Sequence, residues 1–154
     1  MRRRRPEKRV ILPDTKYNDL SVAKFINYIM ESGKKGIAEK IFYSAMDIIQ
    51  KKTKTDGIKI FKKGIENASP SVEVKSRRIG GATYQVPIEV PKNRSFYLAS
   101  LWIIKSSNNS SGKPMSEKLA GELISAANGE GGAIKKKDDT HRMADANKAF
   151  AHFR

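Results

Sequence analysis

The spacing of the apolar residues changes twice along this chain, and these changes constrain the fold more than any other feature. From residue 22 to residue 68, apolar side chains recur every three or four positions, which is the period of one helix face. Between residues 72 and 90 they alternate with polar side chains, as in a β-strand. After residue 94 the helical period returns. The pattern therefore predicts a mainly α fold that contains one β-hairpin.

Three helices are expected before the hairpin, each with an apolar face and a stop signal. We expect the first to end at Gly33, the second near Asp56-Gly57 and the third before Pro70, which disfavours helix in the residue before it. Short loops between them predict antiparallel packing. The three apolar faces consist of Val22, Phe25, Ile26, Ile29 and Met30; of Ala38, Ile41, Phe42, Ala45 and Ile49; and of Ile58, Phe61, Ile65 and Ala68.

The register of the hairpin depends on the length of its loop. A two-residue turn at Gly80-Gly81 would place Val74 opposite Pro87 and divide the apolar side chains between the two faces. A three-residue loop over residues 80–82 places Val74 opposite Ile88 and gathers the apolar side chains on one face. Because one buried face normally fixes the register, the three-residue loop is the predicted one.

Three further helices are expected after the hairpin. The first extends from about residue 94 to residue 105, with Trp102 in its apolar stripe and therefore in the core. Residues 106–112 have the serine, asparagine and glycine content of a loop. The second helix ends at Asn128-Gly129, and the third begins at Gly131-Gly132. The expected apolar stripes contain Leu98, Leu101 and Trp102; Met115, Leu119, Leu123, Ala126 and Ala127; and Met143, Ala146, Phe150 and Phe153.

The expected organisation is a flexible basic arm followed by a single domain. Residues 1–13 form the arm, because like charges at this density keep a segment open. Residues 14–154 form one helical domain, whose six helices make a bundle-like body. A two-stranded β-hairpin at about residues 72–90 protrudes from this body.

The net charge indicates the class of binding partner. The chain has 31 Lys+Arg and 16 Asp+Glu, which gives a formal charge of +15. Such an excess repels itself in a folded monomer unless an anion neutralises it, and nucleic acid is the usual polyanion. One alternative is a basic surface kept for solubility. Binding to a membrane surface would need one long amphipathic basic segment, whereas here the charge is spread over the whole chain.

Several classes of function lack the residues that they require. The chain has no cysteine, so it has no disulfide and no thiolate metal site. No apolar run approaches the ~20 residues of a membrane span, and the basic N-terminus has no apolar stretch after it, so we expect a cytoplasmic protein. His141 and Asp145 have helical metal-ligand spacing but no third ligand. No nucleotide-binding or catalytic motif is present, so neither an enzyme nor a cofactor nor a small-molecule substrate is expected.

The basic residues gather in the N-terminal arm, in one loop between helices, in the hairpin and in the last helix. Such side chains position a protein on phosphates without reading bases. The candidate residues for RNA backbone contact are Arg2, Arg3, Arg4, Arg5, Lys8, Arg9, Lys34, Lys35, Lys75, Arg94, Lys113, Lys135, Lys136, Lys137, Arg142 and Lys148.

The hairpin tip forms a second candidate group, because a tip has no core that its charged side chains could serve. It comprises Arg77, Arg78, Gly80, Gly81 and Tyr84. In the predicted register Tyr84 lies opposite Arg78. Its ring either stacks on an RNA base or covers the ribbon, and the sequence does not decide between the two.

Two long segments, residues 70–87 and 141–154, resemble the bacterial seventh small-subunit ribosomal protein family. Residues 11–14 and 27–35 fit the same family, and the resemblance extends from about residue 2 to the end. The chain departs from the family pattern in two places. Residues 106–112 are rich in serine and asparagine where relatives carry more basic residues, and the arginine run at residues 2–5 is denser.

The resemblance implies a function as well as a fold of six helices with an extended ribbon. It implies a structural constituent of the small ribosomal subunit that binds the 3′ major domain of 16S ribosomal RNA and nucleates assembly of the 30S head. It also implies a position beside the exit-site transfer RNA and the messenger RNA path, with Arg77, Arg78, Gly80 and Gly81 nearest to them. The implied protein partners are the ninth and eleventh proteins of the subunit.

Two other classes of function are weaker alternatives. A DNA-binding architectural protein is disfavoured because the charge lies on arms and loops rather than on one recognition helix. An RNA-processing enzyme would need a metal site or an acid–base cluster, and the sequence has neither.

Overall fold

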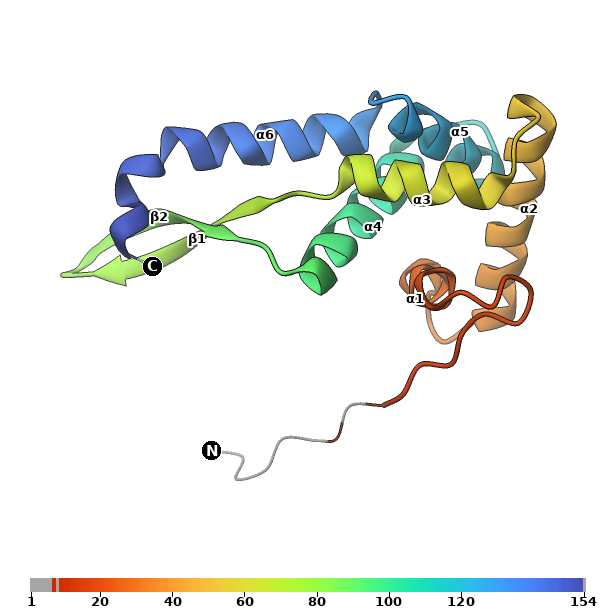
Figure 1. Ribbon diagram of the computed structural model, residues 1–154, viewed down its shortest axis with the longest axis horizontal. Coiled ribbons are helices and arrows are strands. Elements are labelled where there is room, and N and C mark those ends of the chain that lie inside the picture. Colours follow the sequence, from red (N-terminus) through yellow and green to blue (C-terminus); the bar gives the residue numbers. More distant parts are fainter. Residues whose placement is uncertain (1–6, 8, 154) are drawn as a thin grey trace. The chain divides into compact units, whose positions relative to one another are not determined.

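The computed structural model describes Glu7 and residues 9–153, and this part of the chain is mainly helical (Figure 1). Its six α-helices and one antiparallel hairpin confirm the predicted fold class. In chain order the elements are α1 (Leu20–Ile29), α2 (Lys35–Thr53), α3 (Gly57–Ala68), β1 (Val72–Ile79), β2 (Ala82–Glu89), α4 (Lys92–Asn109), α5 (Met115–Ala127), α6 (Gly132–Ala146) and the 3-10 helix η1 (Lys148–Phe153).

The chain divides into two compact units, one ending at Glu39 and the other beginning at Lys40. The predicted division into an arm over residues 1–13 and one domain over residues 14–154 stays a prediction. No helix in the described ranges combines the length and the apolar character that a bilayer crossing requires.

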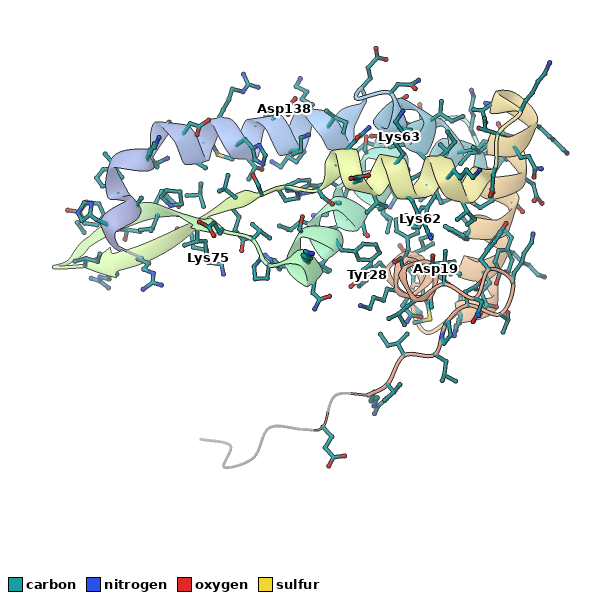
Figure 2. The ribbon with its side chains drawn as sticks, viewed as in Figure 1. Asp19, Tyr28, Lys62, Lys63, Lys75 and Asp138 are labelled. Atoms are coloured by element: carbon teal, nitrogen blue, oxygen red, sulfur yellow. The ribbon has the colours of Figure 1, made fainter. Side chains whose placement is uncertain are left out.

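The first unit contains α1, which begins where the sequence provides a cap. The Asp19 carboxylate, labelled in Figure 2, accepts a hydrogen bond from the Ser21 backbone N–H at 2.7 Å and so satisfies a donor at the helix start. The predicted apolar face is buried at Val22, Phe25, Ile26 and Ile29, where α1 ends. The helix thus stops before the predicted stop at Gly33, which lies with a positive φ in the turn before α2.

The core of the second unit contains buried apolar side chains from α2, α3, α4 and α5. Phe42 and Phe61 are fully buried, and their rings meet edge to face with centroids 5.3 Å apart. Helix α3 packs against α4, α5 and α6, and α5 also packs against α4. Leu119 and Leu123 of α5 are fully buried at the predicted positions. These helices form the body from which the ribbon extends in Figure 1.

The hairpin has a two-residue turn, so the predicted three-residue loop is wrong. Gly80 and Gly81 occupy the turn with φ of +55° and +89°, and β1 and β2 pair with Val74 opposite Pro87. Consecutive residues with positive φ give a turn whose twist matches that of the strands, and glycine adopts this conformation without steric cost. The assumption of a single apolar face failed because Val86 and Pro87, which point to opposite faces, are both buried.

Helix α4 extends to Asn109, so residues 106–109 are helical and not part of the predicted loop. Ser107 is buried within the helix, where its hydroxyl donates to the Ile103 carbonyl at 2.8 Å. A serine can sit inside a helix when its hydroxyl finds this internal acceptor. The buried face contains Ile103 and Ile104, whereas Trp102 is only half-buried. The prediction that Trp102 belongs to the core is therefore wrong.

The helix predicted from Met143 and Ala146 is present as α6, although both of these residues are exposed. The buried residues of α6 are Ala133, Ile134, Thr140 and Ala144. The α-helical geometry ends at Asn147, and the chain continues as the 3-10 helix η1, so Phe150 is out of phase with the residues of α6. The side chain of Phe153 lies outside the described part.

Candidate nucleic-acid interface

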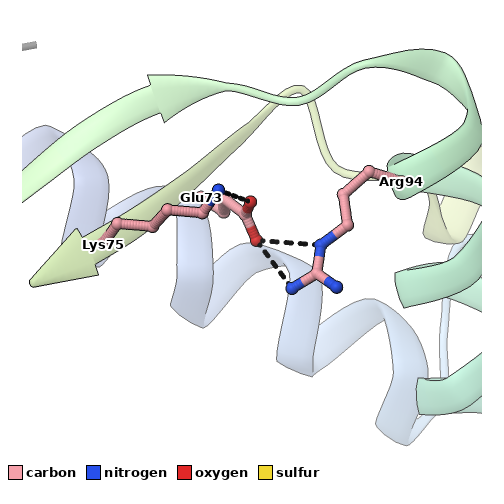
Figure 3. A network of polar contacts seen from close by, with 3 residues as sticks. All are labelled: Glu73, Lys75 and Arg94. Carbon is pink, nitrogen blue, oxygen red and sulfur yellow. Dashed lines mark hydrogen bonds and ion pairs between the residues drawn. The ribbon is translucent and has the colours of Figure 1, made fainter. Parts of the chain in front are cut away.

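Three charged side chains form a network at the base of the ribbon (Figure 3). Glu73 of β1 has a buried carboxylate, whose Oε2 accepts hydrogen bonds from Nε and Nη2 of Arg94 at 3.4 and 3.3 Å. The other oxygen, Oε1, lies 3.4 Å from Nζ of Lys75. The Arg94 guanidinium also lies 5.3 Å from the centre of the Tyr97 ring. One carboxylate therefore fixes two of the predicted RNA-binding cations at the junction of β1 and α4.

Lys137 has an internal partner at the end of α3. Its Nζ donates to the Asn67 carbonyl at 2.7 Å. The Asn67 side-chain amide in turn donates to the carbonyls of Ala126 and Ala127 at 2.9 and 3.0 Å. The last carbonyls of a helix lack partners within the helix, so a lysine is well placed there. Lys137 thus joins α6 to the end of α3, and the Asn67 side chain joins α3 to the end of α5.

Two further candidates form ion pairs on their own helices. Arg142 pairs with Asp139, one turn earlier on α6. Lys35 lies 4.0 Å from Glu39 on α2. Exposed pairs of this kind contribute little to stability and leave the cations accessible.

The remaining described candidates are exposed and lack internal acidic partners. Within Glu7 and residues 9–153, none of their side chains forms an ion pair or a hydrogen bond with another residue. Their charge is therefore available to an external anion. They are Arg9, Lys34, Arg77, Arg78, Lys113, Lys135, Lys136 and Lys148. The predicted sites at Arg2, Arg3, Arg4, Arg5 and Lys8 lie outside the described residues.

The ribbon tip differs from its base in the exposure of its residues. Arg77, Arg78, Gly80 and Gly81 are all exposed. Tyr84 lies opposite Arg77, not Arg78, and its ring is 5.3 Å from that of Phe150 in η1. The structure thus favours the second of the two roles considered for Tyr84, in which the ring covers the ribbon.

His141 attaches α6 to the start of the ribbon. Its Nε2 lies 3.2 Å from the Ser71 backbone N–H and accepts a hydrogen bond from it. The described residues contain no group of three histidine or acidic side chains that could hold a metal ion. His141 therefore has a structural contact where the sequence offered only a spacing.

Sequence reasoning missed Glu73 and Asn67 as organising residues. A signal for Glu73 was present, because it is the one acidic residue in the otherwise neutral or basic strand β1. No comparable signal identifies Asn67, whose partners are 59 and 60 residues away in the sequence.

Comparison with known proteins connects this interface to a family. The family model described as ribosomal protein S7p/S5e matches residues 1–148. The chain belongs to this family. Two bacterial relatives, both small ribosomal subunit protein uS7, are similar over almost the whole length. The one from Anaeromyxobacter sp. (strain Fw109-5) is 58% identical over 153 residues, which is 99% of this chain and 98% of the relative. The one from Thermotoga maritima is 57% identical over 154 residues, or 100% and 99%.

Membership of the S7p/S5e family settles the class of protein. The chain is a ribosomal protein of the small subunit, in the cytoplasmic ribosome, and it is not an enzyme. The resemblance noted in residues 70–87 and 141–154 is confirmed at the level of the family. Membership also gives the exposed cations a class of partner, because a ribosomal protein works within a ribonucleoprotein.

Proposed function

We propose that this protein binds the 3′ major domain of 16S ribosomal RNA as a primary binder and nucleates assembly of the 30S head. The observation that carries the proposal is the set of exposed cations without internal partners, held on helices and on a ribbon with a buried base. A polyanion that meets such a surface releases condensed counterions, which favours binding without requiring base readout.

The mechanism is scaffolding. RNA helices repel each other at a junction because every phosphate carries a charge. Cations on a folded protein lower this repulsion, and the folded backbone that carries them needs no further ordering when RNA binds. Lys135 and Lys136 on α6 and Lys113 before α5 are the body contacts in this proposal. Arg2, Arg3, Arg4, Arg5 and Lys8 are proposed to contribute from the N-terminal segment.

The ribbon tip has a separate proposed role. Arg77, Arg78, Gly80 and Gly81 lie beside the exit-site transfer RNA and the messenger RNA path in this proposal. Exposed glycines let a nucleic-acid backbone approach closely, and arginine suits both phosphate contacts and stacking on unpaired bases. The neighbouring ninth and eleventh proteins of the subunit are the proposed protein partners.

The experiment compares binding of the full-length protein to the isolated 3′ major domain RNA and to duplex DNA at equal salt. We expect a marked preference for the folded RNA, together with co-sedimentation with small subunits that is lost only at high salt. Equal affinity for duplex DNA would favour an architectural DNA-binding protein instead.

A matched pair of variants tests which cations act in this binding. Lys135→Gln with Lys136→Gln should weaken RNA binding, because both residues are exposed on α6. Lys51→Gln with Lys52→Gln removes the same charge from the exposed end of α2 and should have a smaller effect. Equal losses in the two double variants would show that net charge alone, and not the proposed surface, determines binding.

A further inference from the structure

A hollow between α4 and α6 combines an aromatic ring with two cations. Its volume is about 280 Å³, and the ring is that of the half-buried Trp102. The four α4 residues that line it have the spacing i, i+3, i+4 and i+7, so they share one helix face. The lining consists of Trp102, Lys105, Ser106 and Asn109 from α4 and of Gly132 and Lys136 from α6.

A close approach of the two helices fixes one wall of this hollow. A Cβ atom on Gly132 would lie 2.3 Å from Oγ of Ser106, which is closer than any real contact. A larger residue at this position would force the Ser106 hydroxyl to rotate away, and Cβ of Ser106 at 3.2 Å would still leave little room. The hollow is thus a consequence of helix packing and does not depend on a loop conformation.

The lining also limits the chemistry of the occupant. No carboxylate or imidazole lines the hollow, so a metal ion would have no suitable charged ligand. The Glu122 carboxylate accepts a hydrogen bond from the Ala133 backbone N–H at 2.9 Å and so occupies a donor at the start of α6. An anion would therefore be held by Lys105 and Lys136. Both lysines are exposed and, within the described ranges, have no ion pair.

We propose that this hollow receives one unpaired RNA base, stacked on the indole of Trp102. Stacking on an aromatic ring is the usual way in which proteins hold an unpaired base. Lys105 and Lys136 would contact the flanking phosphates. The Ser106 hydroxyl and the Asn109 amide can each donate to or accept from a base edge. The inference rests on the proposed RNA binding and adds to it a base-holding site on α4 and α6.

The test uses the fluorescence of Trp102, which is the only tryptophan of the chain. Full-length protein is titrated with the 3′ major domain RNA, and binding is followed separately by the anisotropy of labelled RNA. We expect Trp102 emission to be quenched in step with binding and to become protected from acrylamide. Trp102→Leu should weaken binding by about 5- to 150-fold, the range that corresponds to one stacked base, whereas Trp102→Phe should retain most of the affinity.

The two readouts separate failure of this inference from failure of the proposed function. RNA binding with unchanged Trp102 emission and unchanged acrylamide access would overturn the base site and leave RNA binding intact. Absence of RNA binding would overturn both. If a free nucleoside monophosphate quenches Trp102 emission as strongly as the RNA does, and saturably, the hollow is a nucleotide site and the proposed RNA base site is overturned. Protection of Trp102 in whole subunits, but not by RNA alone, would assign the hollow to a protein partner and overturn the proposal.

Discussion

The base and the tip of the β-ribbon carry similar basic residues in different environments. At the base, Lys75 and Arg94 meet the buried Glu73 carboxylate, and Val86 is fully buried. At the tip, Arg77 and Arg78 are exposed and have no acidic partner in the described part of the chain. The Glu73 carboxylate thus holds two cations in place at the base of the ribbon, and the tip has no equivalent acidic residue among the described residues.

A basic residue of the ribbon has one of two roles. A cation paired with a buried carboxylate helps to set the position of the strand, because its geometry is fixed by hydrogen bonds as well as charge. A cation without such a partner keeps its interaction with solvent ions until a phosphate replaces them. On this view the base holds the ribbon and the tip binds the partner.

The largest expected effect on stability lies in the apolar part of the ribbon base. Val86→Ala should lower the free energy of unfolding by about 2 kcal/mol, because it removes two fully buried methyl groups and leaves a cavity. Ile79→Ala at the exposed tip should change it by less than about 0.5 kcal/mol. Urea denaturation measures both. Equal losses would remove the distinction between base and tip.

A smaller effect is expected from the charge network. Glu73→Gln should lower the free energy of unfolding by about 1 kcal/mol, because it removes a charged acceptor from Arg94 while both cations stay largely solvated. The exposed Glu66→Gln is the control and should have almost no effect. The difference between the two variants should shrink in high salt, and a difference that is independent of salt would argue against an electrostatic role.

The aromatic contact between η1 and the ribbon should contribute less to the free energy of unfolding than the Glu73 charge network does. Phe150→Leu and Tyr84→Leu, measured singly and together in a double-mutant cycle, should show a coupling energy of about 0.5 kcal/mol for the ring pair. A coupling energy of zero would mean that Tyr84 gains nothing specific from Phe150. Its ring would then be available for the alternative role of stacking on a base.

The smallest expected effect on stability is at the tip. Arg77→Ala with Arg78→Ala should leave the free energy of unfolding within about 0.5 kcal/mol of wild type. Incorporation into small subunits should also be nearly normal, while exit-site transfer RNA binding or frame maintenance should be disturbed. Sedimentation and a transfer RNA binding assay measure these outcomes. If the double variant fails to bind ribosomal RNA, the division of roles between body and tip is wrong.

The sequence predicts the helices well where local signals and packing agree. The predicted apolar face of α3 is buried at Phe61, Ile65 and Ala68, and Pro70 follows the end of that helix as predicted. Prediction failed where tertiary packing replaced the local rule. Ser107 is buried inside α4 because its hydroxyl donates a hydrogen bond to the Ile103 carbonyl. Val86 and Pro87 are both buried although they point to opposite faces of the ribbon. Neither arrangement follows from composition or period.

The sequence also locates the basic clusters but not the role of each cation. Three consecutive lysines stand at residues 135–137, and of these only Lys137 donates a hydrogen bond to the Asn67 carbonyl. That distinction depends on the rotation of α6 against α3. The apolar neighbours of Trp102 in the sequence predict a core position. Trp102 lines a hollow instead, because residues 106–109 are helical and place Ser106 and Asn109 on the same face of α4.

The central claim is that cations without internal partners bind a folded polyphosphate, and the salt dependence of RNA binding tests it most directly. Affinity for the isolated 3′ major domain RNA is measured across a range of salt concentrations by filter binding. The account predicts a linear fall of log affinity with log salt, with a slope of about −0.7 to −0.9 for each phosphate neutralised. The exposed pair Lys135 and Lys136 should account for part of that slope. An affinity that does not change with salt would contradict the account.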